Sequence, residues 1–147
     1  MLHFEGESEF PQMPEQVWAK LSDARFLVQC LPEVTSVSHL EPRTAQCVLR
    51  PGLSFMRGTL EVTLQVADAV SPTLVRVHGH GKGIGSSNDV EATLAIEPQG
   101  SGTRVHWSAD ITNLHGLLKA VPQGLLKGAA QKVIGDVWAT VANQLSG

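Results

Sequence analysis

The chain has 147 residues, with 11 Lys and Arg against 14 Asp and Glu, so its formal net charge is −3. This length suits one domain, and a weakly acidic chain without a basic run is a poor candidate for non-specific nucleic-acid binding. Hydrophobic residues make up 42% of the chain, and charged residues make up only 17%. The composition excludes a disordered chain and indicates a folded domain with abundant apolar surface to bury.

The ends and the apolar segments show no sign of export or of a membrane span. Residues 1–10 (MLHFEGESEF) are acidic and alternate in polarity, unlike a signal or transit peptide. Lys119, Pro122 and Lys127 interrupt the most apolar stretch, which falls short of the ~18 apolar residues that a bilayer span needs. We therefore expect a cytoplasmic protein.

The two cysteines, Cys30 and Cys47, have no CxxC spacing and no cluster of Cys or His around them. Buried free thiols are the expected state of such residues. A single disulfide between them is the alternative.

The first thirty residues predict a strand followed by two short helices. From Leu2 to Phe10, apolar or small residues alternate with His and Glu, which is typical of a strand with one wet face. A proline in the first turn suits a helix over 14–22. Ser22 or Asp23 is a suitable cap for a second helix over about 23–30.

From residue 34 to residue 113 the pattern changes to short strands joined by turns. Polar and apolar residues alternate with a period of two, and Ser71-Pro72 and 99–102 are typical turn sequences. Short connections of this kind favour an antiparallel meander. We expect six strands in this region, and the clearest alternation covers 43–50, 58–68, 74–82, 88–97 and 103–112.

Near the C-terminus the apolar period lengthens to about 3.6 residues, which predicts one long amphipathic helix over 122–145. Its apolar stripe comprises Leu126, Ala130, Val133, Val137 and Val141. The economical packing lays this stripe across the concave, apolar face of a curved sheet. We therefore predict a single α+β domain over residues 1–147, with about seven antiparallel strands wrapped around the C-terminal helix.

The glycine-rich run 79–85 (GHGKGIG) does not fit a nucleotide-binding loop. Its spacing matches neither GxGxxG nor GxxxxGK[ST], and strand patterns flank it on both sides. We interpret it as a strand end that is bulged or tightly bent. Gly79 and Gly81 would leave one strand face without side chains, which enlarges any cavity there.

The sequence predicts neither catalytic residues nor a metal site. The predicted inward positions of the central strands hold no ionisable residue, and no inward His accompanies either Cys. His78, His80 and His106 fall on the predicted outer face beside arginine and lysine residues, where a positive field would not favour a cation. We expect no catalytic residue, no metal ligand and no cofactor.

A curved sheet around one helix tends to leave space between them, and an apolar cavity is a default site for a small molecule. The segment 114–126 would lie at the mouth of this cavity, as a gate, a membrane contact or an ordinary hydrophobic turn. Each apolar lining residue is also a candidate for a filled core. The predicted cavity-lining residues are Trp18, Phe26, Leu31, Phe55, Met56, Leu60, Val62, Val77, Gly79, Leu94, Trp107, Ala109, Leu118, Val121, Leu126, Ala130 and Val133.

Five segments that span nearly the whole chain carry a resemblance to a known family. They are GESEFPQMPEQVWAKLSD (6–23), CLPEV (30–34), GHGKGIG (79–85), EATLAIEPQGSGTRVHWSADI (91–111) and GLLKAVPQGLLKGAAQKV (116–133). In them the chain resembles the carbon monoxide dehydrogenase CoxG family of the START/polyketide cyclase-like (SRPBCC) superfamily, whose fold is the helix-grip. Two positions depart from the family pattern: Glu33 stands where a Gly is expected, and Pro122 interrupts the expected helix.

The resemblance implies an internal cavity that holds a hydrophobic small molecule, lipid or quinone-like. Because the predicted inner face holds no ionisable residue, we expect non-enzymatic binding or carriage of this molecule. The resemblance also implies an accessory role beside a molybdenum-containing carbon monoxide dehydrogenase-type enzyme, with at most peripheral membrane contact. Two alternatives stay open. One is a small cyclase, lyase or hydrolase of the same superfamily, and the other is an assembly factor with a filled core.

Overall fold

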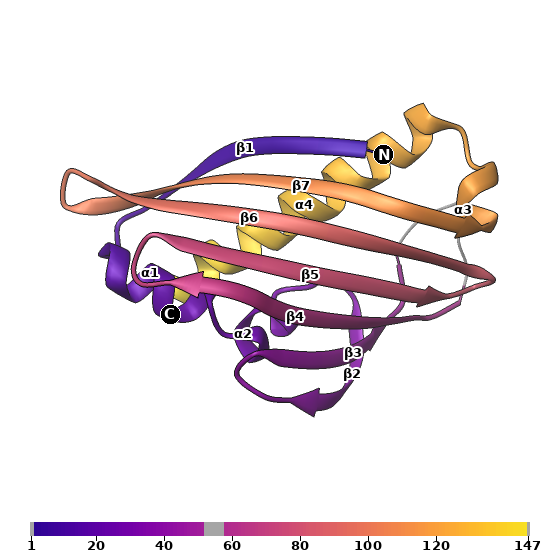
Figure 1. Ribbon diagram of the computed structural model, residues 1–147, viewed down its shortest axis with the longest axis horizontal. Coiled ribbons are helices and arrows are strands. Elements are labelled where there is room, and N and C mark those ends of the chain that lie inside the picture. The colour runs from indigo at the N-terminus through magenta and orange to yellow at the C-terminus, as the bar shows by residue number, and fades with distance from the viewer. Residues whose placement is uncertain (1, 52–57, 147) are drawn as a thin grey trace.

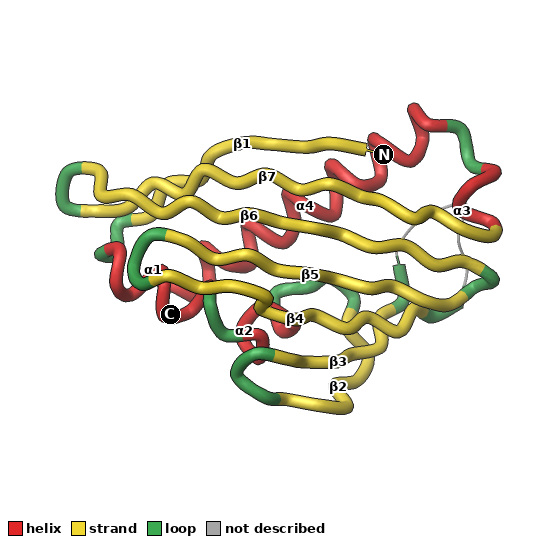
Figure 2. Tube along the Cα trace, in the orientation of Figure 1, coloured by secondary structure: helices red, strands yellow, loops and turns green. Residues whose placement is uncertain are grey.

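The computed structural model describes residues 2–51 and 58–146. Its elements follow the expected order of strand, two short helices, six strands and a long helix, with one extra short helix before the last (Figure 2). They are β1 (Leu2–Phe10), α1 (Pro14–Leu21), α2 (Ala24–Gln29), β2 (Val34–Leu40), β3 (Thr44–Leu49), β4 (Leu60–Val70), β5 (Leu74–Gly83), β6 (Ser86–Gln99), β7 (Gly102–Gly116), α3 (Leu117–Ala120) and α4 (Gln123–Ser146).

The strands form one seven-stranded antiparallel sheet in the order β1-β7-β6-β5-β4-β3-β2. Strands β2 to β7 are a meander in which each strand pairs with the next, and β1 pairs with β7 at the far edge. Helix α4 lies across one face of this sheet, and α1 and α2 lie near its C-terminal end (Figure 1). The predicted α+β helix-grip architecture is confirmed.

Two local details explain how the short helices are delimited. Asp23 caps α2, because its carboxylate accepts a hydrogen bond from the Arg25 amide at 2.9 Å. The Arg25 side chain donates to the same carboxylate and holds the Asp23 pKa below its ordinary value. Beyond α2, Glu33 takes a left-handed conformation with φ 60°, which explains why a glycine suits this position.

The glycine-rich run forms the end of β5 and its turn into β6, as predicted. Ile84 and Gly85 are the two turn residues, with φ values of 55° and 64°. Positive φ at both central residues is the requirement of a type I′ hairpin turn. Gly83 is needed for close approach, because a Cβ there would lie 2.4 Å from the Thr59 carbonyl oxygen.

The segment around residue 115 differs from the prediction. Strand β7 continues to Gly116 rather than ending near residue 112, because a register shift against β6, with Asn113 at φ 52°, breaks the alternation without ending the pairing. The chain then forms the short helix α3, which was not predicted. Pro122 lies just before α4, and its carbonyl oxygen accepts hydrogen bonds from the first turn of that helix.

The apolar core of the described residues falls into two clusters. The large cluster lies where α1, α2 and the end of α4 meet the sheet, and its most buried members include Val17, Leu21, Val28, Val75 and Val141. The small cluster lies where the start of α4 meets β1 and α3, and consists of Leu2, Phe4, Leu118 and Leu126. Trp107 on β7 packs against both clusters.

Candidate functional site

Small residues lie close together on the inner face of the sheet, which is the face toward α4. They are Gly79 and Gly81 on β5, Ala92 on β6 and Ala109 on β7. Ala92 pairs directly with Ala109, and Gly79 pairs with Val90. These positions make a strip of sheet from which little side-chain volume projects.

Three apolar side chains belong to neither of the two clusters. They are Val90 on β6, Ala109 on β7 and Val133 on α4, and of these Ala109 is buried. Along α4, Ala130 packs against the small cluster and Val137 packs against the large one, so Val133 lies between two packed turns. Among the residues that the structure describes, the two clusters are therefore discontinuous here, and we call this discontinuity the interruption.

The predicted cavity-lining residues divide among these regions. Those in or against the large cluster are Trp18, Phe26, Leu31, Val62, Val77 and Leu94. Those in or against the small cluster are Leu60, Leu118, Val121, Leu126 and Ala130. Trp107 joins the two clusters, and Ala109, Val133 and the neighbouring Gly79 lie at the interruption. Phe55 and Met56 lie outside the described residues.

An aromatic stack forms the boundary of the large cluster at the interruption. The rings of Trp107 and Trp138 lie 6.1 Å apart at 26°, and Phe10 lies 6.2 Å from Trp138. Trp107 covers Gly6 on β1, where a Cβ would come within 2.7 Å of the indole. The absence of a side chain at Gly6 therefore lets the Trp107 indole lie directly against strand β1.

The segment predicted at the cavity mouth is attached to the β5–β6 turn. The Leu117 amide donates to the Gly85 carbonyl at 3.1 Å, and the Leu118 amide donates to the Ser86 hydroxyl at 3.1 Å. Leu118 is buried, but Leu117 and Leu125 are 62% and 47% exposed. Apolar side chains are therefore presented to solvent at the small-cluster end.

The inner positions of β4 to β7 carry no ionisable side chain, as the sequence indicated. The polar side chains there are Ser86, Asn88 and Thr103. Sequence reasoning did not identify Asn88, although extending the alternation of 90, 92 and 94 by one step places it on the same face. This apolar surface suits binding of a hydrophobic molecule better than acid–base chemistry.

The two cysteines are free and buried in the large cluster, as predicted. Burial raises the pKa of the Cys30 thiol to about 11 and also raises that of Cys47. Both are therefore protonated at neutral pH, which makes them poor nucleophiles.

The outer face of the sheet carries the histidines, and their surroundings differ from the prediction. His78 contacts Glu91, and His80 lies 2.7 Å from Asp89. The expected positive field is wrong, because the neighbours across the strands are carboxylates that a single strand's sequence does not show. Within residues 2–51 and 58–146, no group of three His, Cys, Asp or Glu side chains is placed to hold a metal ion.

Hydrogen bonds on the outer face shift the pKa values of Asp89 and His3. Hydrogen bonds from Asn113 and His80 lower the pKa of Asp89. Hydrogen bonds to Asp110 and Glu5 raise the pKa of His3 above its ordinary value. These are exposed pairs on the face opposite to α4.

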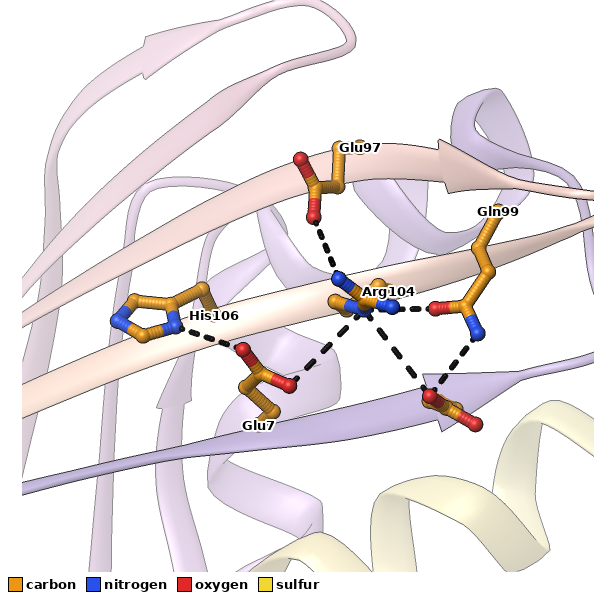
Figure 3. Close-up of polar contacts among 6 residues, drawn as sticks. Glu7, Glu97, Gln99, Arg104 and His106 are labelled. Atoms are coloured by element: carbon orange, nitrogen blue, oxygen red, sulfur yellow. Dashed lines mark hydrogen bonds and ion pairs between the residues drawn. The ribbon is translucent and has the colours of Figure 1, made fainter.

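A polar network ties β1, β6 and β7 together on the same outer face (Figure 3). Arg104 donates to the Gln99 amide oxygen at 2.7 Å and lies 3.5 Å from Glu97 and 3.9 Å from Glu7. Beside it is a surface depression of about 330 Å³ at the β6–β7 hairpin. The depression contains none of the predicted lining residues, and its lining residues are Glu9, Phe10, Pro11, Gln99, Gly102 and Thr103.

Solved structures place this arrangement in a known fold class. A conserved protein from Geobacillus kaustophilus matches with a TM-score of 0.86 at 21% identity, covering 99% of this chain and 95% of its own. A START superfamily protein from Mycobacterium smegmatis matches with a TM-score of 0.71 at 13% identity, covering 98% and 97%. The fold is therefore that of the START-like helix-grip proteins.

The family follows from the sequence itself. The profile of the CoxG family, which is named for a subunit of carbon monoxide dehydrogenase, matches residues 6–146. The chain belongs to this family. No curated protein matches the chain. No helix within the described ranges combines the length and the hydropathy that a membrane crossing requires.

Proposed function

We propose that this protein binds and carries a hydrophobic small molecule, lipid or quinone-like, between helix α4 and the inner face of the sheet, without catalysing a reaction. The observation that carries the proposal is the interruption between the two apolar clusters at Val90, Ala109 and Val133. It coincides with the strip of small residues, and one apolar cluster lies on each side of it. An apolar space of this kind favours a hydrophobic ligand.

The inner face supports carriage rather than catalysis. General acid–base catalysis needs titratable groups that reach the substrate, and the described inner positions of β4 to β7 supply none. The predicted lining residues that fall beside the interruption are Gly79, Trp107, Ala109, Ala130 and Val133. The remaining predicted residues within the described ranges would set the ends of the ligand site rather than its middle.

The family name supports an accessory role beside a carbon monoxide dehydrogenase-type enzyme, and the proposal places this role in the cytoplasm. In this proposal the carrier exchanges its ligand with that enzyme. The exposed Leu117 and Leu125 lie at the small-cluster end, where a ligand would enter and where peripheral contact with a membrane would occur.

The test is solvent extraction of gently purified protein, with the extract identified by mass spectrometry. We expect a lipid or quinone at a stoichiometric amount. Ala109→Trp should fill the space and release the molecule, while the chain remains folded. Ala95→Trp is the matched control, because Ala95 lies exposed on the outer face of the neighbouring strand, and it should retain the molecule.

The proposal is overturned if the extract is empty and the protein also takes up no added alkyl-chain quinone. Unfolding of Ala109→Trp under the same conditions would show that this region is filled. A pull-down that recovers a dehydrogenase equally with the wild type and Ala109→Trp would then favour the assembly factor.

A further inference from the structure

Asn88 is a polar residue of the inner face that the proposed function leaves without a role. It lies on β6 directly opposite Gly81 on β5, so the two share one face of the sheet. A Cβ on Gly81 would come within 2.8 Å of the Asn88 Oδ1 atom. The Asn88 amide therefore occupies the space that a side chain at residue 81 would take.

The other polar side chains on the inner face of β4 to β7 are already paired. Thr103 donates to the Gln12 carbonyl at 2.7 Å. Ser86 donates to the Ile84 carbonyl and accepts from the Leu118 amide. Asn88 is partly buried, and no hydrogen bond joins its side-chain amide to another of the described residues. The amide keeps contact with solvent, because among the described residues only the Gln12 Oε1 atom is buried without a partner.

A primary amide carries two N–H donors and one carbonyl acceptor. Leaving such a group unpaired when an apolar ligand displaces its water is unfavourable. A ligand oxygen at this position would replace that water, whereas a plain hydrocarbon would not. The amide would also pair with either a carbonyl or a hydroxyl, because it both donates and accepts.

We infer that Asn88 is a specificity-determining residue, which selects apolar molecules that carry a carbonyl or hydroxyl oxygen over hydrocarbons of the same shape. This inference rests on the proposed function. The oxygen-bearing end of the ligand lies at Asn88, and its apolar body follows Val90 and Ala109 toward Trp107. Gly81 takes part by leaving the amide its space.

The test compares two probes of matched shape, an alkyl-chain naphthoquinone and the alkylnaphthalene with the same chain, by isothermal titration calorimetry. In the wild type, the quinone should bind about fivefold to tenfold more tightly than the hydrocarbon. Asn88→Leu should abolish this preference and leave the affinity for the hydrocarbon equal or higher. Gln65→Leu removes an exposed amide from the outer face of β4 and should leave the preference intact.

A second variant keeps the amide but moves it. Gly81→Ala places a methyl group 2.8 Å from Asn88 Oδ1, so the amide must shift and the preference should fall although Asn88 is present. If Asn88→Leu lowers both affinities equally, or neither, the inference is overturned while the proposed function stands. If the wild type binds neither probe, both are overturned.

Discussion

The two ends of the space between α4 and the sheet are built differently. At the large cluster, side chains from α1, α2, α4 and the sheet interlock, and residues such as Val17, Leu21 and Val28 have no exposed surface. At the small cluster, Leu118 and Leu126 keep 9% of their surface exposed, and Leu117 and Leu125 face solvent. The comparison indicates that the large cluster contributes more to the stability of the domain. Under the proposed function, the small cluster is the end at which a ligand would exchange.

The sharpest way to break this comparison is to truncate one leucine at each end. Leu21→Ala should cost about 3 to 5 kcal/mol of unfolding free energy, because it leaves a cavity in a fully packed region. Leu126→Ala should cost less, about 2 to 3 kcal/mol, because no member of the small cluster is fully buried and its surroundings have more room to adjust. Urea unfolding measures both losses, provided that the dependence of the unfolding free energy on urea concentration is the same for each variant. Equal losses of unfolding free energy would contradict the difference between the two ends.

The second prediction concerns the backbone connection between β7 and α3 at the small-cluster end. Gly116 joins β7 to α3 with φ 71°, and a Cβ there would lie 1.9 Å from the Gly85 carbonyl oxygen. Gly116→Ala should therefore destabilise the domain by about 2 kcal/mol or more. Gly128→Ala is the control, because a Cβ at this α4 position meets open space, and it should stabilise by about 1 kcal/mol. A neutral Gly116→Ala in thermal unfolding would show that α3 is not fixed to the sheet.

The smallest effect is expected at His3, which pairs with Asp110 across β1 and β7 behind the small cluster. Because the folded state raises the His3 pKa above 6.5, protonation stabilises the fold. This contribution is complete below the unfolded pKa and disappears as the pH rises through the folded pKa. His3→Gln should therefore lose more stability at about pH 5.5 than at about pH 8. Urea midpoints that shift equally at both pH values would exclude this linkage.

Regular alternation made most of the fold predictable. The strand at Leu60–Val70 and the hairpin at 99–102 were evident because period-two patterns and turn residues act locally. The end of β7 was not, because a register shift at Asn113 depends on pairing with β6. Helix α3 was not predictable either, because it is a single turn of four residues. Its first two amides donate hydrogen bonds to Gly85 and Ser86, which lie more than thirty positions earlier in the chain.

The candidate site was predictable only in part, for a related reason. Ala109 and Val133 were identified because they lie on apolar faces, but so do Val77 and Leu94, which pack into the large cluster. Periodicity predicts on which face of a strand or helix a residue lies. It does not predict where along the space between helix and sheet that residue lies. Asn88 was not predicted as a site residue, because its amide is uncharged and only ionisable groups were considered on the inner face.

The stacked indoles at the boundary give the protein an optical signal of its own. Trp107 and Trp138 are two of the three tryptophans in the chain, and their rings lie 6.1 Å apart at 26°. The strong far-ultraviolet transitions of two indoles at this separation couple and produce a pair of circular dichroism bands of opposite sign. Since Trp107 also borders the interruption, a ligand bound there as proposed would change the coupling, and its loading and release would be observable in unlabelled protein.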